Sequence, residues 1–242
     1  MASMPAPAAD GAPEAGGPLF DLRDEHVRAG STEALRGVDL RVERGEKLVV
    51  IGPSGAGKTT LLRLLQSLRP ADCACVHQDY ALVPQLSAFH NVYAGRLDRN
   101  STLANLVDLV RPRRRVVEEL RPLFRDLGME EKLFEAVSRL SGGQQQRVAV
   151  GRALYQGGSV VLADEPVSAV DPHQAGDVLE LLKAGCETAV VAMHDVDLAL
   201  RHFDRAVGLR EGRVAFDLGS SEVGGGRLEA LYRGEANPEP PT

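Results

Sequence analysis

The chain has 242 residues, of which 43% are hydrophobic and 26% are charged, and its formal net charge is −6. These values are ordinary for a soluble globular protein and allow one α/β domain with a small insertion, or two small domains. An acidic chain without tryptophan and with only 4% aromatic residues is poorly suited to bind nucleic acid, because it lacks a positive surface and stacking platforms. No apolar run approaches the ~20 residues that cross a bilayer, so a role at a membrane would need another subunit to span it.

The two ends of the chain differ in composition from the rest. Residues 1–18 are rich in Ala, Pro and Gly and lack the basic start and apolar stretch of a signal peptide. We expect a disordered lead over 1–18, a folded domain over 19–235 and a flexible tail over 236–242. The chain has three cysteines, Cys73, Cys75 and Cys186. They make no disulfide framework and have no partner pair at zinc spacing, which favours reduced thiols.

The first predicted elements surround a glycine-rich loop. Residues 38–42 alternate apolar and charged side chains, as a half-buried strand does. A turn at 45–46 separates them from the continuous apolar run 47–51, which is typical of a buried parallel strand. From Lys58 onward, leucines recur at helical spacing. The segment therefore predicts two strands followed by a helix.

Residues 85 to about 139 have a different character. Prolines and amphipathic pieces such as "TLANLVDLV" and "VVEELRPLFRDLGM" predict a helical subdomain inserted in the α/β core. The basic run "RPRRR" at 111–115 lies inside it. A solvated loop or helix end is favoured for this run over a nucleic-acid patch.

The α/β pattern resumes at residue 159. An apolar strand over 159–163 precedes a helix at Asp171-Pro172, with Asp as N-cap and Pro at the first helical position. A strand over 188–193, a helix over 195–203 and a hairpin turned at Glu211-Gly212 follow. The whole chain thus predicts an α/β core with buried strands of the parallel type and a C-terminal hairpin.

The segment "GPSGAGKT" at 52–59 carries the strongest chemical signal. It matches G-x-x-x-x-G-K-[ST] between a predicted strand and a predicted helix, which is the context of a phosphate-binding loop. Backbone N–H groups and the helix dipole would bind the phosphates, Lys58 would reach the β/γ-phosphates, and the Thr59 hydroxyl would bind Mg²⁺. The nucleotide-binding candidates here are Gly52, Pro53, Ser54, Gly55, Ala56, Gly57, Lys58, Thr59 and Thr60.

A second motif, "VVLADEP" at 160–166, supplies the acidic groups that such a loop requires. The strand ends at Asp164, which is placed to hold Mg²⁺. Glu165 would position or deprotonate the attacking water. The alternative is an acidic pair at a strand end that is only solvated.

Together with "LSGGQ" at 140–144, these motifs make the sequence resemble the ATP-binding cassette family over nearly all of 20–235. The resemblance implies an α/β fold with a P-loop NTPase core of the ABC type, that is, a mainly parallel sheet with helices on both faces, a small antiparallel part and an inserted helical subdomain. Gln78 matches the Q-loop glutamine, which touches Mg²⁺ and the membrane subunit, so Thr59, Gln78 and Asp164 form the implied metal set. His194 matches the switch histidine at the γ-phosphate and would act with Glu165 in catalysis. The signature matches are Ser141, Gly142, Gly143 and Gln144, and the D-loop matches run from Ser168 to Asp171.

The resemblance also implies an assembly. In the family two cassettes pack head to tail, and the signature helix of one caps the γ-phosphate held by the P-loop of the other. We therefore expect a homodimer that uses ATP and Mg²⁺, lies peripherally at the cytoplasmic face of the inner membrane and binds transmembrane permease subunits. A solute-binding protein would be an indirect partner, and no nucleic acid is expected.

A finer resemblance concerns the transported solute. The segments "LVPQLSAFHNVYAGRL", "STLANLV", "SGGQQQRVAVGRAL" and "HDVDLALRHFDRAVGLREGRVAFD" look like the ATP-binding subunits of phosphonate importers. They imply uptake of phosphonate or a related oxyanion. The alternatives are a soluble ABC-type ATPase acting on nucleic acid or ribosomes, an export or lipoprotein-release ATPase, and a relic that binds ATP without turnover. Glu165 and His194 argue against the relic.

The sequence departs from the family at two points. The position that usually carries an aromatic residue for adenine stacking falls near Ala29, and His26 is the nearest ring. Losing that stack removes about 1–3 kcal/mol of binding if nothing compensates. Lys58 and Gln78 stand only 20 positions apart. The chain therefore lacks room there for a hairpin of the antiparallel subdomain.

Overall fold

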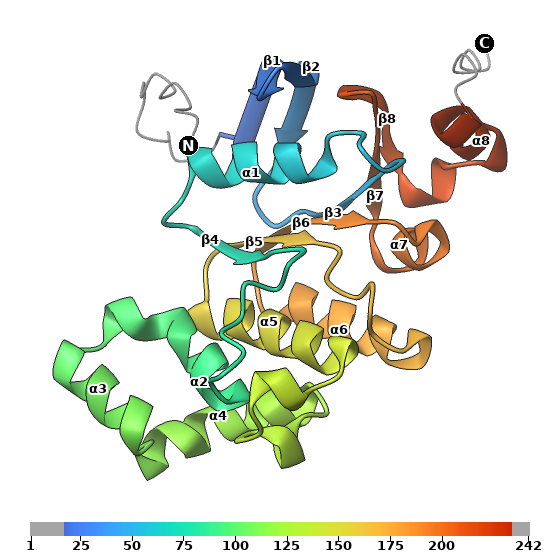
Figure 1. The fold of residues 1–242 in the computed structure, drawn as a ribbon. Helices are drawn as coiled ribbons and strands as arrows, with labels where there is room; N and C mark the ends of the chain where they lie inside the picture. The colour runs from blue at the N-terminus through green and yellow to red at the C-terminus, as the bar shows by residue number, and fades with distance from the viewer. Residues whose placement is uncertain (1–16, 234–242) are drawn as a thin grey trace.

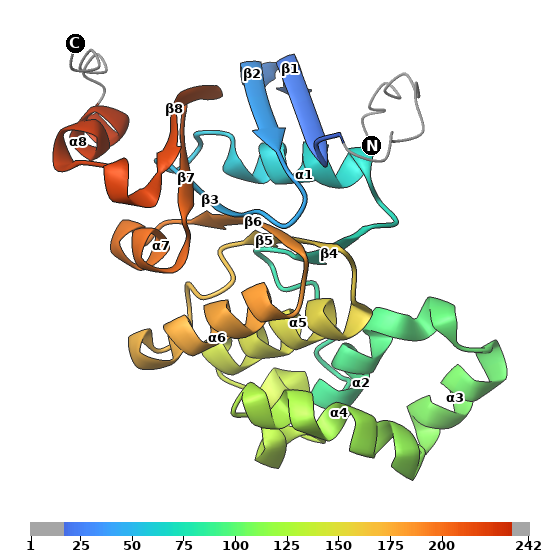
Figure 2. The ribbon, with the colours of Figure 1, turned by 180° about the vertical axis from the view of Figure 1, so that it is seen from behind.

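The computed structural model describes residues 17–233 (Figures 1 and 2). Most of the predicted lead over 1–18 and all of the predicted tail over 236–242 lie outside these residues. Within the described part, a central sheet has the strand order β4-β5-β6-β3-β7-β8, in which only β8 runs antiparallel. The strands are β3 (Lys47–Ile51), β4 (Cys73–Val76), β5 (Val160–Asp164), β6 (Thr188–Met193), β7 (Arg205–Arg210) and β8 (Arg213–Gly219).

The central strands are apolar because both faces of the sheet are covered. Leu48 and Val50 of β3 belong to one hydrophobic core, and Val49 and Ile51 belong to a second core on the opposite face. Successive side chains of a strand point to opposite faces, so a strand buried on both sides must be apolar throughout. This explains why β3, β5 and β6 read as continuous apolar runs rather than as alternating ones.

One face of the sheet carries α1 (Lys58–Leu68) and an antiparallel pair formed by β1 (Phe20–Ala29) and β2 (Thr32–Val42). In Figure 1 the hairpin rises above α1, away from the sheet. The apolar side chains of 38–42 are buried in the same core as the leucines of α1, and the charged ones between them are exposed. The half-buried strand predicted over 38–42 is confirmed.

The other face carries α5 (Gly142–Gln156) and α6 (Pro172–Ala184), and smaller helices complete the C-terminal part. Asp171 caps α6 by accepting a hydrogen bond from the His173 N–H at 2.9 Å, as the sequence predicts. The β7–β8 hairpin turns at Glu211 and Gly212, whose φ angles of 48° and 79° suit a tight two-residue turn. The C-terminal helices are α7 (Val196–His202), a 3-10 turn (Ser220–Glu222) and α8 (Gly225–Arg233).

A run of helices between β4 and α5 lies on the far side of α5 from the sheet (Figure 1). It contains α2 (Ala88–Tyr93), α3 (Thr102–Val110), α4 (Arg114–Asp126) and the 3-10 helices Ala94–Arg99, Glu130–Lys132 and Val137–Arg139. Phe89, Leu120 and Phe124 are fully buried between these helices and α5. Apolar burial is thus what holds this segment on the core.

The connection from α1 to β4 is very short, as the spacing predicts. Helix α1 ends at Leu68 and β4 begins at Cys73, so β1 and β2 form a two-stranded sheet within the described residues. Cys73 and Cys75 lie on β4 as free thiols. Burial raises the pKa of Cys73 to about 12 and that of Cys75 to about 11, so both thiols stay protonated at neutral pH.

Candidate functional site

The predicted site residues meet because neighbouring parallel strands end at one edge of the sheet. The phosphate loop follows β3, Gln78 follows β4, Asp164 ends β5, and His194 follows β6. Ligands of open α/β sheets bind at this carboxyl edge. A cavity of about 240 Å³ there is lined by Ala34, Ser54, Gly55, Ala56, Gly57, Lys58, Thr59, Thr60, Gln78, Asp164, Glu165 and His194.

The phosphate loop is close-packed against the β2 strand and the β7–β8 hairpin. Gly57 has a φ of 108°, and a Cβ there would lie 2.7 Å from the Ala34 carbonyl oxygen. A Cβ at Gly52 would collide with the Leu209 carbonyl. Glycine is therefore required at both positions, because any other side chain meets backbone that cannot move aside. The loop leads directly into α1, whose free N–H groups favour an anion.

The ammonium of Lys58 is buried inside this loop. Its Nζ donates to the carbonyl oxygens of Gly52 at 2.7 Å and Pro53 at 3.1 Å, and the residue is only 7% exposed. Burial lowers the Lys58 pKa, while the nearby carboxylates of Glu165 and Asp164 act in the opposite direction. Among residues 17–233 its hydrogen-bond partners are these two neutral carbonyls, and no carboxylate forms an ion pair with it.

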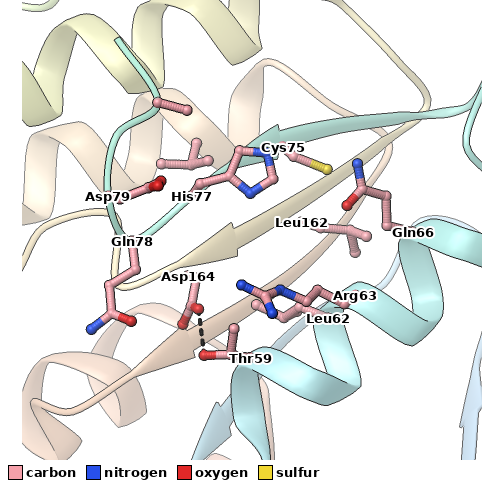
Figure 3. A pocket seen from close by; sticks show the side chains of 12 residues that line it. Thr59, Leu62, Arg63, Gln66, Cys75, His77, Gln78, Asp79, Leu162 and Asp164 are labelled. Carbon is pink, nitrogen blue, oxygen red and sulfur yellow. Dashed lines mark hydrogen bonds between the residues drawn. The ribbon is translucent and has the colours of Figure 1, made fainter. Parts of the chain in front are cut away.

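Thr59 and Asp164 form an oxygen cluster beside the loop. The Thr59 hydroxyl donates to Asp164 Oδ2 at 2.6 Å, and Gln78 lies on the other side of Asp164 (Figure 3). Hydroxyl, amide and carboxylate oxygens are donors that suit Mg²⁺. Among residues 17–233 no group of three or more His, Cys, Asp or Glu side chains is placed to hold a metal. The oxygens of this cluster fit a divalent ion such as Mg²⁺.

Glu165 and His194 form a pair at the rim of the cavity. His194 Nε2 lies 3.2 Å from Glu165 Oε1, and the imidazole is about half exposed. Glu165 has a φ of 53°, which a side chain with a Cβ rarely adopts, and its N–H is held by the Ala192 carbonyl at 2.9 Å. Such backbone strain concentrates at functional sites, because the surrounding contacts must enforce it.

The signature residues do not line this cavity. Ser141 caps α5: its hydroxyl accepts from the Gln144 N–H at 3.3 Å, and its own N–H donates to the Gln144 side chain at 3.0 Å. Gly142 and Gly143 form the first turn of α5. The helix starts at α1 and at α5 are thus separate from each other within one chain.

The first turn of α5 is packed against the D-loop of the same chain. A Cβ at Gly143 would lie 2.5 Å from the Ala169 carbonyl oxygen. Gln146, which is only 1% exposed, donates to the carbonyl of Glu165 and to the Ser168 hydroxyl at 3.2 Å, and it accepts from the Ala169 N–H at 2.8 Å. Sequence reasoning missed Gln146. Its position on the buried face of α5, in line with Ala149, Val150 and Ala153, was the available signal.

Neither residue considered for adenine stacking lines the cavity. Ala29 is the last residue of β1. The His26 ring is held by Glu33 at 2.9 Å and by Asp24 at 3.3 Å, and these carboxylates raise its pKa. Both ring nitrogens of His26 therefore contact carboxylates of the β1–β2 hairpin.

A larger cleft of about 770 Å³ opens beside the oxygen cluster (Figure 3). Arg63 and Gln66 of α1 face it from one side, and Cys75, His77 and Asp79 from the other. Thr59, Gln78 and Asp164 also line it. The short connection between α1 and β4 forms no hairpin over this side of α1, so the oxygen cluster is reached from two directions.

A family model described as "ABC transporter" matches residues 35–168, which is more than half of the chain. The chain therefore belongs to the ABC transporter family, and the fold class predicted from the sequence is confirmed. Within residues 17–233 no helix is both long and apolar enough to cross a membrane.

The individual proteins to which the chain is similar are ATP-binding proteins or cassettes. The chain is 41% identical, over 98% of its length, to the phosphonates import ATP-binding protein PhnC of Anaeromyxobacter dehalogenans, and spans 51% of that relative. It is 41% identical to phosphonates import ATP-binding protein PhnC 1 of Pseudomonas syringae pv. syringae, over 86% of this chain and 89% of that one. A dimeric ATP-binding cassette bound to ADP and Pi in a post-hydrolysis state has a TM-score of 0.67 and 26% identity, covering 83% of this chain and 98% of that one.

Proposed function

We propose that the protein is the ATP-binding and ATP-hydrolysing subunit of an ABC importer, and that it couples hydrolysis to uptake of phosphonate or a related oxyanion. The observation that carries the ATPase proposal is the Glu165–His194 pair at the rim of the phosphate-loop cavity. The solute class comes from the names of relatives that align with most of the chain.

The residues on the phosphate side of the site have two functions, phosphate binding and metal binding. Backbone N–H groups of 52–60 and the Lys58 ammonium bind the β- and γ-phosphates, as the close-packed glycines and the buried charge suggest. Thr59, Asp164 and Gln78 would hold Mg²⁺, which would supply positive charge against the phosphates. The Thr59–Asp164 hydrogen bond keeps two of these oxygens together.

Hydrolysis requires a water in line with the γ-phosphorus. Glu165 orients this water and takes its proton as the oxygen attacks phosphorus. The bond between the γ-phosphorus and the β,γ-bridging oxygen breaks, its electron pair stays on ADP, and inorganic phosphate leaves. His194 holds the Glu165 carboxylate and contacts the γ-phosphate from the rim.

The complete site needs a second copy of the chain. Ser141 uses its hydroxyl to cap Gln144, so the N–H groups of Gly142 and Gly143 remain available to an anion outside the helix. In a head-to-tail homodimer this helix start closes the partner's phosphate loop. ATP then joins the subunits, and hydrolysis releases them. The dimer lies at the cytoplasmic face of the membrane on permease subunits that receive solute from a binding protein.

The variant Glu165→Gln tests the hydrolytic assignment. It removes the general base but keeps the shape of the side chain, so we expect unchanged ATP binding, loss of turnover and an ATP-dependent dimer in size-exclusion chromatography. Glu187→Gln, at an exposed glutamate outside the site, is the matched control and should turn over normally. Wild-type turnover in Glu165→Gln would refute the assignment.

The importer assignment is tested separately. Purification of the tagged protein from detergent-solubilised native membranes should recover a permease with several membrane spans. Recovery of soluble partners alone, with the protein absent from the membrane fraction, would favour a soluble ABC-type ATPase instead.

A further inference from the structure

Helix α3 turns its apolar face away from the protein core. Its apolar side chains face solvent: the exposed fractions are 73% for Leu103, 58% for Leu106 and 80% for Val110. Leu109 and Val107 are also exposed. Two polar residues of the same helix lie on its inner side: Asn105 is half-buried and Asp108 is fully buried. A surface helix of a soluble protein normally shows the reverse pattern.

This orientation is fixed by hydrogen bonds to the buried polar residues. Asp108 accepts from Arg113 Nη2 at 2.6 Å and from the Tyr93 hydroxyl at 2.9 Å. The Tyr93 hydroxyl also lies 2.9 Å from the Asn105 amide oxygen, and the Asn105 amide donates to the Leu97 carbonyl at 2.9 Å. Turning the leucines inward would break all of these bonds and expose Asp108. The outward apolar face is therefore built into the structure.

A basic segment follows the apolar helix directly. Residues 100–115, which we name the α3 corner, contain four arginines and one aspartate in a chain whose net charge is −6. Arg113 is paired with Asp108, and Arg114 with the exposed Glu118. Among the described residues, Arg111 and Arg115 have no ion pair. The corner lies at the outer edge of the helical segment in both views (Figures 1 and 2).

We propose that the α3 corner contacts the anionic surface of a lipid bilayer. Exposed aliphatic side chains beside arginines match the boundary between acyl chains and headgroups, where both groups are satisfied. Cytoplasmic leaflets are negative and attract arginines within a Debye length. The remainder of this acidic chain is repelled by such a surface, so the corner also orients the molecule on it.

The charge pattern favours lipid over a second copy of the chain. Two corners meeting face to face would bring unpaired arginines together, whereas anionic headgroups neutralise them. The inference adds a lipid contact that ATP hydrolysis does not need. It concerns residues outside the phosphate-loop cavity, so the two proposals fail independently.

Vesicle flotation with the purified full chain tests the proposal. The vesicles contain either phosphatidylcholine alone or phosphatidylcholine with about one third phosphatidylglycerol. We expect the wild type to float with the anionic vesicles only, and to dissociate as the salt concentration rises. Failure of the wild type to bind anionic vesicles at low salt would overturn the proposal.

Two pairs of substitutions identify the surface. Leu106→Gln with Val110→Gln removes apolar contact, and Arg111→Gln with Arg115→Gln removes unpaired charge; each pair should weaken binding by roughly ten-fold or more. The control pair Leu68→Gln with Arg28→Gln changes an exposed leucine and an exposed arginine elsewhere and should bind as the wild type does. ATP turnover in solution checks that each variant folds.

Two outcomes would reassign the surface. If both corner pairs float as well as the wild type, lipid binding lies elsewhere and the proposal is wrong. If the wild type ignores vesicles but binds native membranes, and the corner pairs lose that binding, the corner contacts a membrane protein and not lipid.

Discussion

Gln146 links the first turn of α5 to the loop that carries Glu165. Replacing it with Leu keeps the volume but leaves the Ala169 N–H and the Glu165 carbonyl without this partner. We expect a loss of about 1–3 kcal/mol in stability and a larger relative loss in kcat, because Glu165 depends on neighbouring contacts for its strained backbone. Nucleotide affinity should stay near the wild-type value, since Gln146 does not line the phosphate-loop cavity.

Steady-state kinetics and nucleotide titration measure the two effects. Gln156→Leu, at the other end of α5, removes a side-chain hydrogen bond to the Cys73 carbonyl and serves as the control. A kcat that falls no further in Gln146→Leu than in an equally destabilised Gln156→Leu would mean that Gln146 is only structural.

The adenine side of the site gives a second prediction at the residue scale. Ala29 stands where the family resemblance places an aromatic ring, and His26 is occupied by Glu33 and Asp24. Ala29→Tyr should therefore tighten ATP binding by about 1–3 kcal/mol through stacking. Titration with a fluorescent ATP analogue measures it, with Ala29→Leu as a control for added apolar bulk. Equal affinity in all three proteins would show that position 29 does not reach the base.

Some residues of the candidate site could be predicted from the sequence and others could not. Lys58, Thr59 and Asp164 could be predicted because each belongs to a short motif beside a strand, and the parallel sheet brings strand ends together. Gln146 could not be assigned in the same way. Its partners lie about twenty positions away at Glu165, Ser168 and Ala169, and only the packing of α5 on that loop brings them together.

At the scale of single elements, the ion pair between the buried Asp108 of α3 and Arg113 makes stability depend on pH. Hydrogen bonds from Arg113 lower the Asp108 pKa to about 2, below its ordinary 3.8. A lowered carboxyl pKa stabilises the fold above the unfolded pKa, and this contribution is lost as pH falls from about 4 towards 2. Because Arg113 is about half exposed, we expect the contribution to be about 1–2 kcal/mol.

The variant Arg113→Gln tests this pair by urea unfolding. It should lower stability at pH 7 and flatten the decline of stability between about pH 4 and 2.5, since the special interaction of the ionised Asp108 is gone. Arg121→Gln, which removes an exposed pair with Glu130, is the control and should change little. A pH profile in Arg113→Gln that parallels the wild type would contradict the assignment.

Helix α3 also shows which property of an element the sequence pattern does not predict. The pattern "TLANLVDLV" predicts an amphipathic helix, and α3 is one. Periodicity alone would turn its leucines inward. The observed face is set by Asp108 and Asn105 meeting Tyr93 and Arg113, and these contacts depend on how α3 returns towards α2 and α4.

For the whole molecule, the alternation of strands and helices was sufficient to predict the α/β class, and the family resemblance added the helices on both faces of the sheet. The short spacing between Lys58 and Gln78 also predicted the reduced antiparallel part. The strand order β4-β5-β6-β3-β7-β8 was not predictable from local patterns, because it depends on which buried strands pair in space. Local apolar runs of similar composition do not specify their neighbours.

The proposed dimer gives the last prediction, because each hydrolytic site would take its phosphate loop and Glu165 from one chain and its signature turn from the other. Ser141→Arg should abolish turnover, since a long charged side chain blocks the α5 start, while ATP binding to the monomer stays intact. Glu165→Gln is inactive for a different reason. Mixing the two inactive proteins before adding ATP forms heterodimers, and each holds one complete site, built from the Glu165 of the Ser141→Arg chain and the signature of the Glu165→Gln chain. Turnover should therefore reappear, at roughly a quarter of the wild-type level if chains pair at random.

A mixture that stays inactive, although native mass spectrometry detects heterodimers, would mean that Ser141 and Glu165 act within one chain or that both sites must be complete. Loss of ATP binding in the Ser141→Arg monomer would place the signature turn in its own chain's nucleotide site and refute the head-to-tail arrangement.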